Sequence, residues 1–484
     1  MPGGRERNAD ERIERLQQEV VRLRDELTRS ETDRARVERE RARLERENAR
    51  LKDELEAARR AGARQAAPFS KGAPKRRPRR AGRKPGAKYG RQGRRPIPAV
   101  VHEPHDVPLP ATCPMCGKRV RETHVASQYQ EDLPPVQPVV RRFDIHIGTC
   151  EGCHRRVQGR HPLQTSEALG AAGVQLGPHA VALAVQLDKQ FGVSFGKIAT
   201  LFRERFGLRV TASAVVRALH RVAAKGQPTY AALCETVRTS AVVAPDETGW
   251  KVGGLLHWLW VFATAMTTVY RICPGRGFAE AVSVLGADFA GGLSRDGWAP
   301  YRQFTEAFHQ SCLGHLLRRC RLLQRDHPRA RLPARIARIL HKALSVRDRH
   351  AAGDVSAHGV DVARGHLFNQ LLDALADVGT IPEVQRFARH LTTELPAIFS
   401  FLVDPALDAT NWRAEQAIRP AVITRKMCGG NRSPQGAETQ HVLTSILRTA
   451  QQRHLDADAV ITTLLHAPAP IVSPQFYPAS ASVN

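Results

Sequence analysis

The sequence SAVVAPDETG, at Ser240–Gly249, is a short apolar run that leads into the acid Asp246. A second run of this kind, GGLSRDG at residues 291–297, leads into Asp296. A third acid, Glu415, lies much further along the chain, in NWRAEQAIRP. Two carboxylates at strand ends and one on a helix form the ligand set that two-metal phosphoryl transfer requires.

The residues around the first two acids predict a small sheet. We expect strands at Ser240–Pro245, Leu255–Ala263 and Thr268–Ile272, a helix at Phe278–Leu285, and a fourth strand that ends at Asp296. Three meandering strands, a helix and a returning strand match the first half of an RNase H-like fold. If the first and fourth strands are parallel neighbours, their two acids lie side by side where ligands collect in open α/β sheets.

Strand alternation separates the two adjacent acids of the first run. Glu247 follows Asp246 directly, so its side chain points to the opposite face of the strand and we interpret it as a supporting residue. Around the third acid, Arg419, Arg425 and Lys426 are predicted to face a DNA backbone. Glu415 and Arg419 could also be a plain i,i+4 surface pair, worth a few tenths of a kcal/mol.

The overall charge indicates a polyanionic partner. The chain has 484 residues and a formal net charge of +26, which favours nucleic acid or an anionic membrane surface. No apolar stretch approaches the ~20 residues of a membrane span, and the first residues lack the apolar core of a secretory signal. Nine cysteines, four of them in CxxC pairs, suit a reduced compartment. We therefore expect a cytoplasmic, nucleoid-associated protein with no membrane partner.

Residues 1–60 are predicted to form a coiled-coil dimerisation helix. One heptad register holds from Ile13 to Leu55, and most other positions are charged. The a positions are Ile13, Val20, Leu27, Arg34, Arg41, Asn48 and Leu55, and the d positions are Leu16, Leu23, Ser30, Val37, Leu44 and Leu51. Asn48 at an a position favours a two-stranded parallel pair. The alternative is a single charged helix held by i,i+4 pairs.

Residues 61–100 are predicted to be a disordered basic arm. Twelve Lys and Arg residues and no acid lie between Lys71 and Arg95, interleaved with Gly and Pro. Such a segment cannot form a core, but its charges can neutralise DNA phosphates. The candidate DNA contacts are Arg76, Arg77, Arg79, Arg80, Arg83 and Lys84. The motif GRKPG resembles a minor-groove hook, although a solvated linker without base preference has the same composition.

Residues 101–165 contain the motifs of a zinc-ribbon-like module. Cys113 and Cys116 form one CxxC pair, and Cys150 and Cys153 form another 33 residues later. Four thiolates are enough to close a tetrahedral structural Zn²⁺ site.

Residues 166–235 are predicted to be helical, with helices at Gly177–Lys189, Ser194–Phe206 and Thr211–Ala224. They could form a helix–turn–helix-like DNA-binding unit or a plain helical layer that connects two domains.

The blocks DETGW, LHWLWVFAT, SRDGWAPY, CLGHLLRR, NWRAEQAIRP and CGGNRS closely resemble the insertion-sequence transposases of the IS-sixty-six type. The resemblance extends over nearly the whole chain and implies an RNase H-like DDE catalytic core at residues 236–455. It also implies a helical insertion at about 302–402, and it leaves residues 456–484 as a tail, which we expect to be disordered from His466. The fold class is thus multidomain α+β.

The resemblance implies that Asp246, Asp296 and Glu415 are the catalytic triad. Hard cations prefer carboxylate oxygens, so the triad would hold two Mg²⁺ ions, with Mn²⁺ as a substitute. Asp246 would contact both ions. The CxxH of Cys312 and His315 also resembles one found in these transposases, but two ligands alone do not make a zinc site.

These patterns together predict an active transposase that binds double-stranded DNA at element ends and at a target. It would cleave and join strands with Mg²⁺ and assemble as a homodimer or larger through the coiled coil, alongside other element-encoded proteins. A catalytically silent relative that acts as a DNA-binding regulator is the main alternative. An RNA-directed RNase H-like nuclease would share the site but leaves the coiled coil unexplained.

Overall fold

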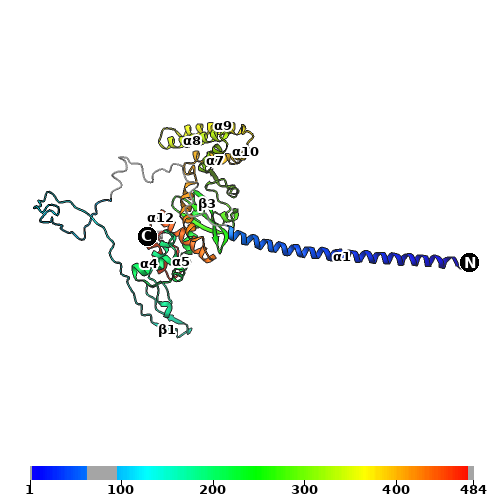
Figure 1. Ribbon diagram of the computed structural model, residues 1–484, viewed down its shortest axis with the longest axis horizontal. Coiled ribbons are helices and arrows are strands. Elements are labelled where there is room, and N and C mark those ends of the chain that lie inside the picture. The colour runs from blue at the N-terminus through cyan, green and yellow to red at the C-terminus, as the bar shows by residue number, and fades with distance from the viewer. Residues whose placement is uncertain (1–2, 63–94, 478–484) are drawn as a thin grey trace.

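The computed structural model describes residues 3–62 and 95–477 (Figure 1). The helices are α1 (Gly3–Gly62), α3 (Pro178–Lys189), α4 (Phe195–Phe206), α5 (Ala212–Arg238), α6 (Phe278–Leu285), α7 (Leu313–Asp326), α8 (Arg331–Ala351), α9 (Ala357–Ala376), α10 (Pro382–Glu394), α11 (Trp412–Cys428), α12 (Pro434–Gln452) and α13 (Ala457–His466). The strands are β1 (Ile147–Thr149), β2 (Arg156–Gln158), β3 (Val242–Val252), β4 (Leu255–Ala263), β5 (Thr268–Cys273), β6 (Gly292–Arg295) and β7 (Phe308–Ser311).

A mixed five-stranded sheet forms the centre, in the order β5-β4-β3-β6-β7. β3, β4 and β5 form an antiparallel meander, because β4 and β5 are continuous apolar runs joined to their neighbours by short turns. β6 pairs with β3 in parallel, at Val242–Gly292 and Val243–Leu293, and β7 pairs with β6 in parallel. The prediction that the first and fourth strands are parallel neighbours is therefore confirmed.

The first strand is longer than its apolar run suggests. We expected it to end at Asp246, but β3 continues through this acid to Val252, where the turn Gly253-Gly254 returns the chain into β4. The expectation that Asp246 lies at a strand end is wrong. The polar residues after Asp246 stay in strand conformation because β4 supplies a hydrogen-bonded partner for each of them.

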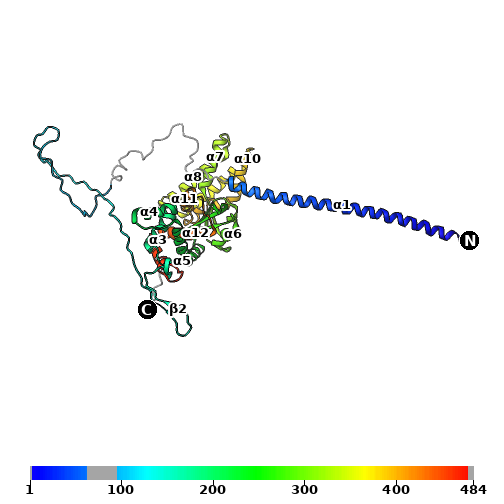
Figure 2. The same ribbon diagram turned by 60° about the horizontal axis from the view of Figure 1, so that its bottom comes forward.

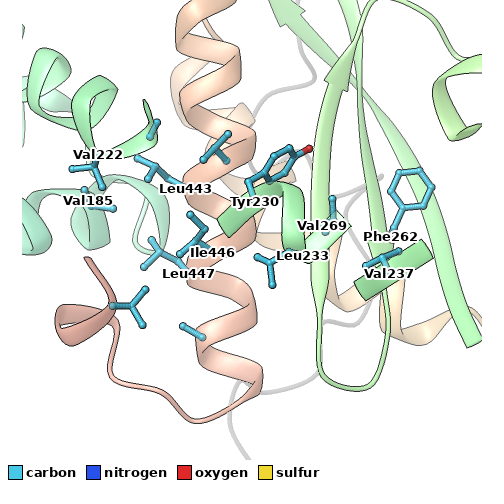
Figure 3. Packing of buried hydrophobic residues seen from close by; sticks show 14 of the residues in the cluster. Val185, Val222, Tyr230, Leu233, Val237, Phe262, Val269, Leu443, Ile446 and Leu447 are labelled. Carbon is cyan, nitrogen blue, oxygen red and sulfur yellow. The ribbon is translucent and has the colours of Figure 1, made fainter. Parts of the chain in front are cut away.

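Helices cover both faces of the sheet because successive strand residues point in opposite directions. On one face, Trp260, Phe262 and Val269 pack against α5 and α12. In Figure 3, the helix that carries Leu443 and Ile446 lies between these strands and the N-terminal helices. On the other face, Leu259, Val261 and Ala263 pack against Ala414, Ala417, Ile418 and Ala421 of α11. Thus α11 is fixed across the meander, with its first turn near β3.

The helical insertion starts later than predicted. Residues 308–311 form β7, the fifth strand of the sheet, so the insertion begins at α7 and not near residue 302. Helices α7 to α10 enclose a hydrophobic core of their own, built around Leu316, Ile336, Leu371 and Phe387. Both views show these helices gathered at one end of the body, away from α3, α4 and α5 (Figures 1 and 2).

The predicted helices at Gly177–Lys189 and Ser194–Phe206 form close to their expected bounds, as α3 and α4, whereas the helix expected at Thr211–Ala224 is longer. Thr211 caps α5, because its side chain accepts from Ala214 N. α5 continues to Arg238, and its second half, including Tyr230 and Leu233, lies in the core beneath the sheet. α5 therefore connects α4 to the sheet, while a DNA-binding role for α4 and α5 stays a prediction.

The C-terminal residues differ from the expected disordered tail. α13 packs Val460, Ile461 and Leu464 into the core shared with α3 and α5. Phe476 is 5% exposed, and Ser473 N donates to Thr229 Oγ1. The expectation of disorder from His466 is thus wrong for the described residues up to Tyr477, since two aromatic side chains anchor a segment that is otherwise rich in Pro and Ala.

No helix among the described residues is long and apolar enough to cross a membrane.

Candidate active site

Asp246 lies on β3, and Asp296 directly follows β6, the parallel neighbour of β3. The observed pairs Val242–Gly292 and Val243–Leu293 are each 50 residues apart in sequence, as are the two acids, and the charge of Asp296 is close enough to raise the pKa of Asp246. Both side chains are half-buried. Each acid is oriented by a nearby backbone N–H: Asp246 Oδ1 accepts from Glu247 N at 2.9 Å, and Asp296 Oδ1 accepts from Trp298 N at 2.9 Å.

The surroundings of Asp246 oppose its negative charge. Burial, together with the nearby charges of Glu247 and Asp296, raises the pKa of Asp246 to about 7. The backbone N–H of Glu247 and the imidazole of His315 act in the opposite direction. A half-buried carboxylate beside two other acids is favourable as an anion only when a cation is close, which is the electrostatic condition of a metal ligand.

Two side chains connect the backbone segments that carry all three acids. Cys312 N donates to Arg295 O, next to Asp296, at 2.8 Å, and Asn411 N donates to Cys312 Sγ at 3.1 Å. Asn411 Nδ2 donates to Pro245 O, next to Asp246, at 2.7 Å. Asn411 also directly precedes α11, four positions before Glu415. The start of α11 is therefore fixed against the ends of the strand segments that precede both aspartates.

Glu415 lies in the first turn of α11, with its side chain 37% exposed. Its Oε1 atom is 3.8 Å from Nδ1 of His315, in the first turn of α7. Among residues 95–477, the ligand atoms of Cys312, His315 and Glu415 all lie within 4.8 Å of one another, whereas those of Asp246, Asp296 and Glu415 do not. The structure thus places His315 beside Glu415 and close enough to Asp246 to lower the pKa of that acid, whereas Glu415 does not gather with the two aspartates within this distance.

The insertion supports the segment that carries Asp296. Arg295 is buried, and its NH1 atom pairs with Glu394 Oε2, at the end of α10, at 2.5 Å. Arg302 pairs with the second oxygen of the same carboxylate at 3.0 Å. A side chain at Gly297 would collide with the ring of His390. Sequence alone could not identify Glu394 as a partner, because it lies 99 residues from Arg295.

Glu247 points away from Asp246, as strand alternation predicted, into a buried polar cluster. Its Oε1 accepts from Arg276 Nε at 2.9 Å, and its Oε2 accepts from Tyr301 Oη at 2.5 Å. Burial raises the pKa of Glu247, whereas Tyr301 and Arg276 lower it. The guanidinium of Arg276 lies 4.5 Å from the ring centre of Trp258 and 3.9 Å from that of Trp298. This cluster packs behind the strand that carries Asp246.

The predicted DNA contacts on α11 have different environments. Arg419 and Lys426 are exposed. Arg425 instead turns inward, where its NH1 atom donates to Thr248 Oγ1 at 2.8 Å and to Gly249 O. The guanidinium of Arg425 therefore holds α11 to β3, and its contact with DNA stays a prediction. The arm residues predicted to contact DNA, 76–84, lie outside the described residues.

The two CxxC motifs form turns with the same hydrogen bonds. In each turn, the N–H of the first cysteine, Cys113 or Cys150, donates to the carbonyl five residues later. The carbonyl of that cysteine accepts from the N–H four residues later, and all four bonds are 2.8–2.9 Å long. Backbone N–H groups of the turns lower the pKa of both thiols, which favours the thiolate. In residues 95–477, however, the sulfur atoms of both motifs do not gather within 4.8 Å, so the shared zinc site stays a prediction.

A comparison with family sequence models identifies the family to which this sheet and its insertion belong. The model described as "Transposase IS66 family" matches residues 173–439, which is more than half of the chain. The match begins just before α3 and ends within α12, so it includes the sheet, the helical insertion and all three acids. A search of curated proteins found no significant match. The chain belongs to the IS66 family of transposases.

Proposed function

We propose that this chain is a DDE-type transposase that cleaves DNA at the ends of its element and joins them to target DNA in a Mg²⁺-dependent reaction. The strand order 5-4-3-6-7, with β6 and β7 parallel to β3, supports an RNase H-like core. The observation that carries the proposal is the proximity of Asp246, on β3, to Asp296, which directly follows the parallel strand β6.

The donor set suits Mg²⁺, because hard cations take carboxylate oxygens and two half-buried acids need a cation nearby. Asp246 and Asp296 would hold one ion together, and Glu415 would complete the second site. Bound Mg²⁺ would supply charge stabilisation for the attacking and leaving oxygens.

The residues of the chain itself set up this arrangement. Glu247 N and Trp298 N orient the two aspartates, and Asn411 holds the start of α11 against β3. Exposed Arg419 and Lys426 would bind phosphates near the site, in addition to the basic arm.

The remaining modules would bind DNA and bring two chains together. Val20, Leu23, Leu27, Val37, Leu44 and Leu51 of α1 are all 47–63% exposed in the single chain. These are a and d positions of the heptad, so we propose that a second α1 covers them in a homodimer. The four CxxC thiolates would close around a structural Zn²⁺ when the two turns meet.

Strand transfer with labelled element ends tests the proposal. Asp246→Asn and Glu415→Gln should each reduce Mg²⁺-dependent transfer at least ~100-fold, because several kcal/mol of charge stabilisation is lost. The matched control is Asp361→Asn, which changes an exposed acid on α9 and should have no effect. If both triad variants transferred strands normally, the assignment of the triad would be wrong. A wild-type protein that bound the ends but never joined them would indicate the regulator instead.

A further inference from the structure

Three potential metal ligands meet between the first turns of α7 and α11. Cys312 directly precedes α7 and is 2% exposed, His315 lies one helical turn later, and Glu415 comes from α11. Their ligand atoms all lie within 4.8 Å of one another. The spacing of a CxxH motif places both of its side chains on one side of a helix start, and the fold supplies the third ligand from 100 residues away.

Two polar atoms at this cluster have no protein partner. His315 Nδ1 and Asn411 Oδ1 are buried and make no hydrogen bond. The distance of 3.8 Å from His315 Nδ1 to Glu415 Oε1 is too long for a hydrogen bond. Buried polar atoms are nearly always paired, and an unpaired one indicates an ion or water that is missing from the description. A cation between the imidazole and the carboxylate would satisfy His315.

The backbone holds the sulfur of Cys312 in place at the start of α7. The sulfur accepts from Asn411 N at 3.1 Å, and Cys312 directly precedes the helix. Backbone N–H donors to a ligating sulfur are typical supports of a metal site. The hydrogen bond from Cys312 N to Arg295 O fixes this sulfur relative to β6.

We propose that Cys312, His315 and Glu415 bind one transition-metal ion of the zinc class, separate from both the Mg²⁺ sites and the CxxC motifs. A thiolate and an imidazole select Zn²⁺ over Mg²⁺, which prefers oxygen ligands. Three protein ligands leave the fourth tetrahedral position open.

The consequence for the active site rests on the proposed function. An ion held by one oxygen of Glu415 would fix the carboxylate in place and leave its second oxygen for Mg²⁺. Cys312 and His315 would then be positioning residues for the third acid of the triad. The zinc-class site itself does not depend on transposition, because it is defined by its ligands.

Metal content of the purified full-length chain tests the site without DNA. His315→Ala should lower bound zinc by one ion per chain relative to wild type, as measured by mass spectrometry after dialysis against excess Mg²⁺. The matched control is Cys320→Ser, which changes another buried cysteine of α7 that lies in the hydrophobic core of the insertion. The control should retain the zinc content of wild type, and any zinc on the CxxC motifs is equal in all three proteins.

Cobalt substitution identifies the ligands directly. The wild-type Co²⁺ protein should show sulfur-to-cobalt charge transfer that decreases in Cys312→Ser, and a changed ligand-field band in His315→Ala. Far-UV circular dichroism identifies any variant that has not folded, and His315, with a side chain 35% exposed, is the less disruptive position. Equal zinc content in wild type and folded His315→Ala would overturn the proposal. Because this readout needs neither DNA nor strand transfer, a negative result here leaves the DDE assignment unaffected.

Discussion

Replacing Asp246 with Asn should stabilise the metal-free protein while removing its activity. In the folded chain, burial and the charges of Glu247 and Asp296 raise the pKa of Asp246 from 3.8 to about 7. The folded state therefore holds this proton more tightly than the unfolded state does. The protonated carboxyl of Asp246 therefore contributes to the free energy of unfolding fully below pH 3.8, and this contribution is lost as the pH rises through about 7. At pH 8 the wild-type protein carries a charge that its surroundings oppose, and the amide does not.

The size of the effect follows from the shift. A rise from 3.8 to about 7 corresponds to ~4 kcal/mol as an upper limit. Because the side chain is only half-buried, solvent screening reduces the expected gain to about 2 kcal/mol at pH 8. For a domain of this size, that gain raises the unfolding temperature by ~4–8 °C. At pH 4 the gain should be close to zero.

Tryptophan fluorescence during thermal unfolding measures this difference in the catalytic core alone. All five tryptophans, Trp250, Trp258, Trp260, Trp298 and Trp412, lie on β3, on β4, on α11 or beside Asp296. The control Asp361→Asn should leave the transition unchanged at both pH values. Added Mg²⁺ should stabilise wild type more than Asp246→Asn. A variant that is no more stable than wild type at pH 8, or equally stabilised at both pH values, would refute the electrostatic description of the site.

Urea unfolding of further variants tests the contacts of Glu247, Gly430 and Phe476. Glu247→Ala leaves Arg276 and Tyr301 without their shared partner and should lower the free energy of unfolding by about 3 kcal/mol. Glu247→Gln should lower it less, and equal losses would exclude the ion pair as the cause. Gly430→Ala should destabilise the protein by about 1–3 kcal/mol, because Gly430 has φ +114° and an added Cβ would collide with Lys251 O. An unchanged urea midpoint would contradict the close contact between Gly430 and the backbone of Lys251. Phe476→Ala should lower the free energy of unfolding by about 3–5 kcal/mol, whereas Val472→Ala, at a position 44% exposed, should lower it by less than about 1 kcal/mol. Equally small effects of both variants would support the expected disordered tail instead.

The sheet could be predicted largely from local patterns. β4, β5 and α6 follow from apolar runs and helical spacing, and the parallel pairing of β3 with β6 follows from the expected strand order. The extent of β3 could not be predicted, because its polar second half is held only by pairing with β4.

The candidate site was predictable in its acids but not in its supports. The family resemblance supplied Glu415, whereas nothing local to Cys312 or Asn411 indicates that they join across 99 residues. The hydrogen bonds of Arg425 to β3 could not be predicted for the same reason, since their acceptors are more than 170 residues away in the sequence. Contacts of this kind depend on how the insertion and α11 pack, and sequence spacing carries no signal for them.

Strand transfer by Asp246→Cys in two metals tests most directly whether residue 246 contacts a catalytic ion. A thiolate is a poor ligand for Mg²⁺ and a better one for Mn²⁺. The account predicts that Asp246→Cys joins element ends to target DNA with Mn²⁺ but not with Mg²⁺, while wild type and Asp361→Cys work with both. Equal activity of Asp246→Cys in the two metals, at the wild-type level, would contradict it.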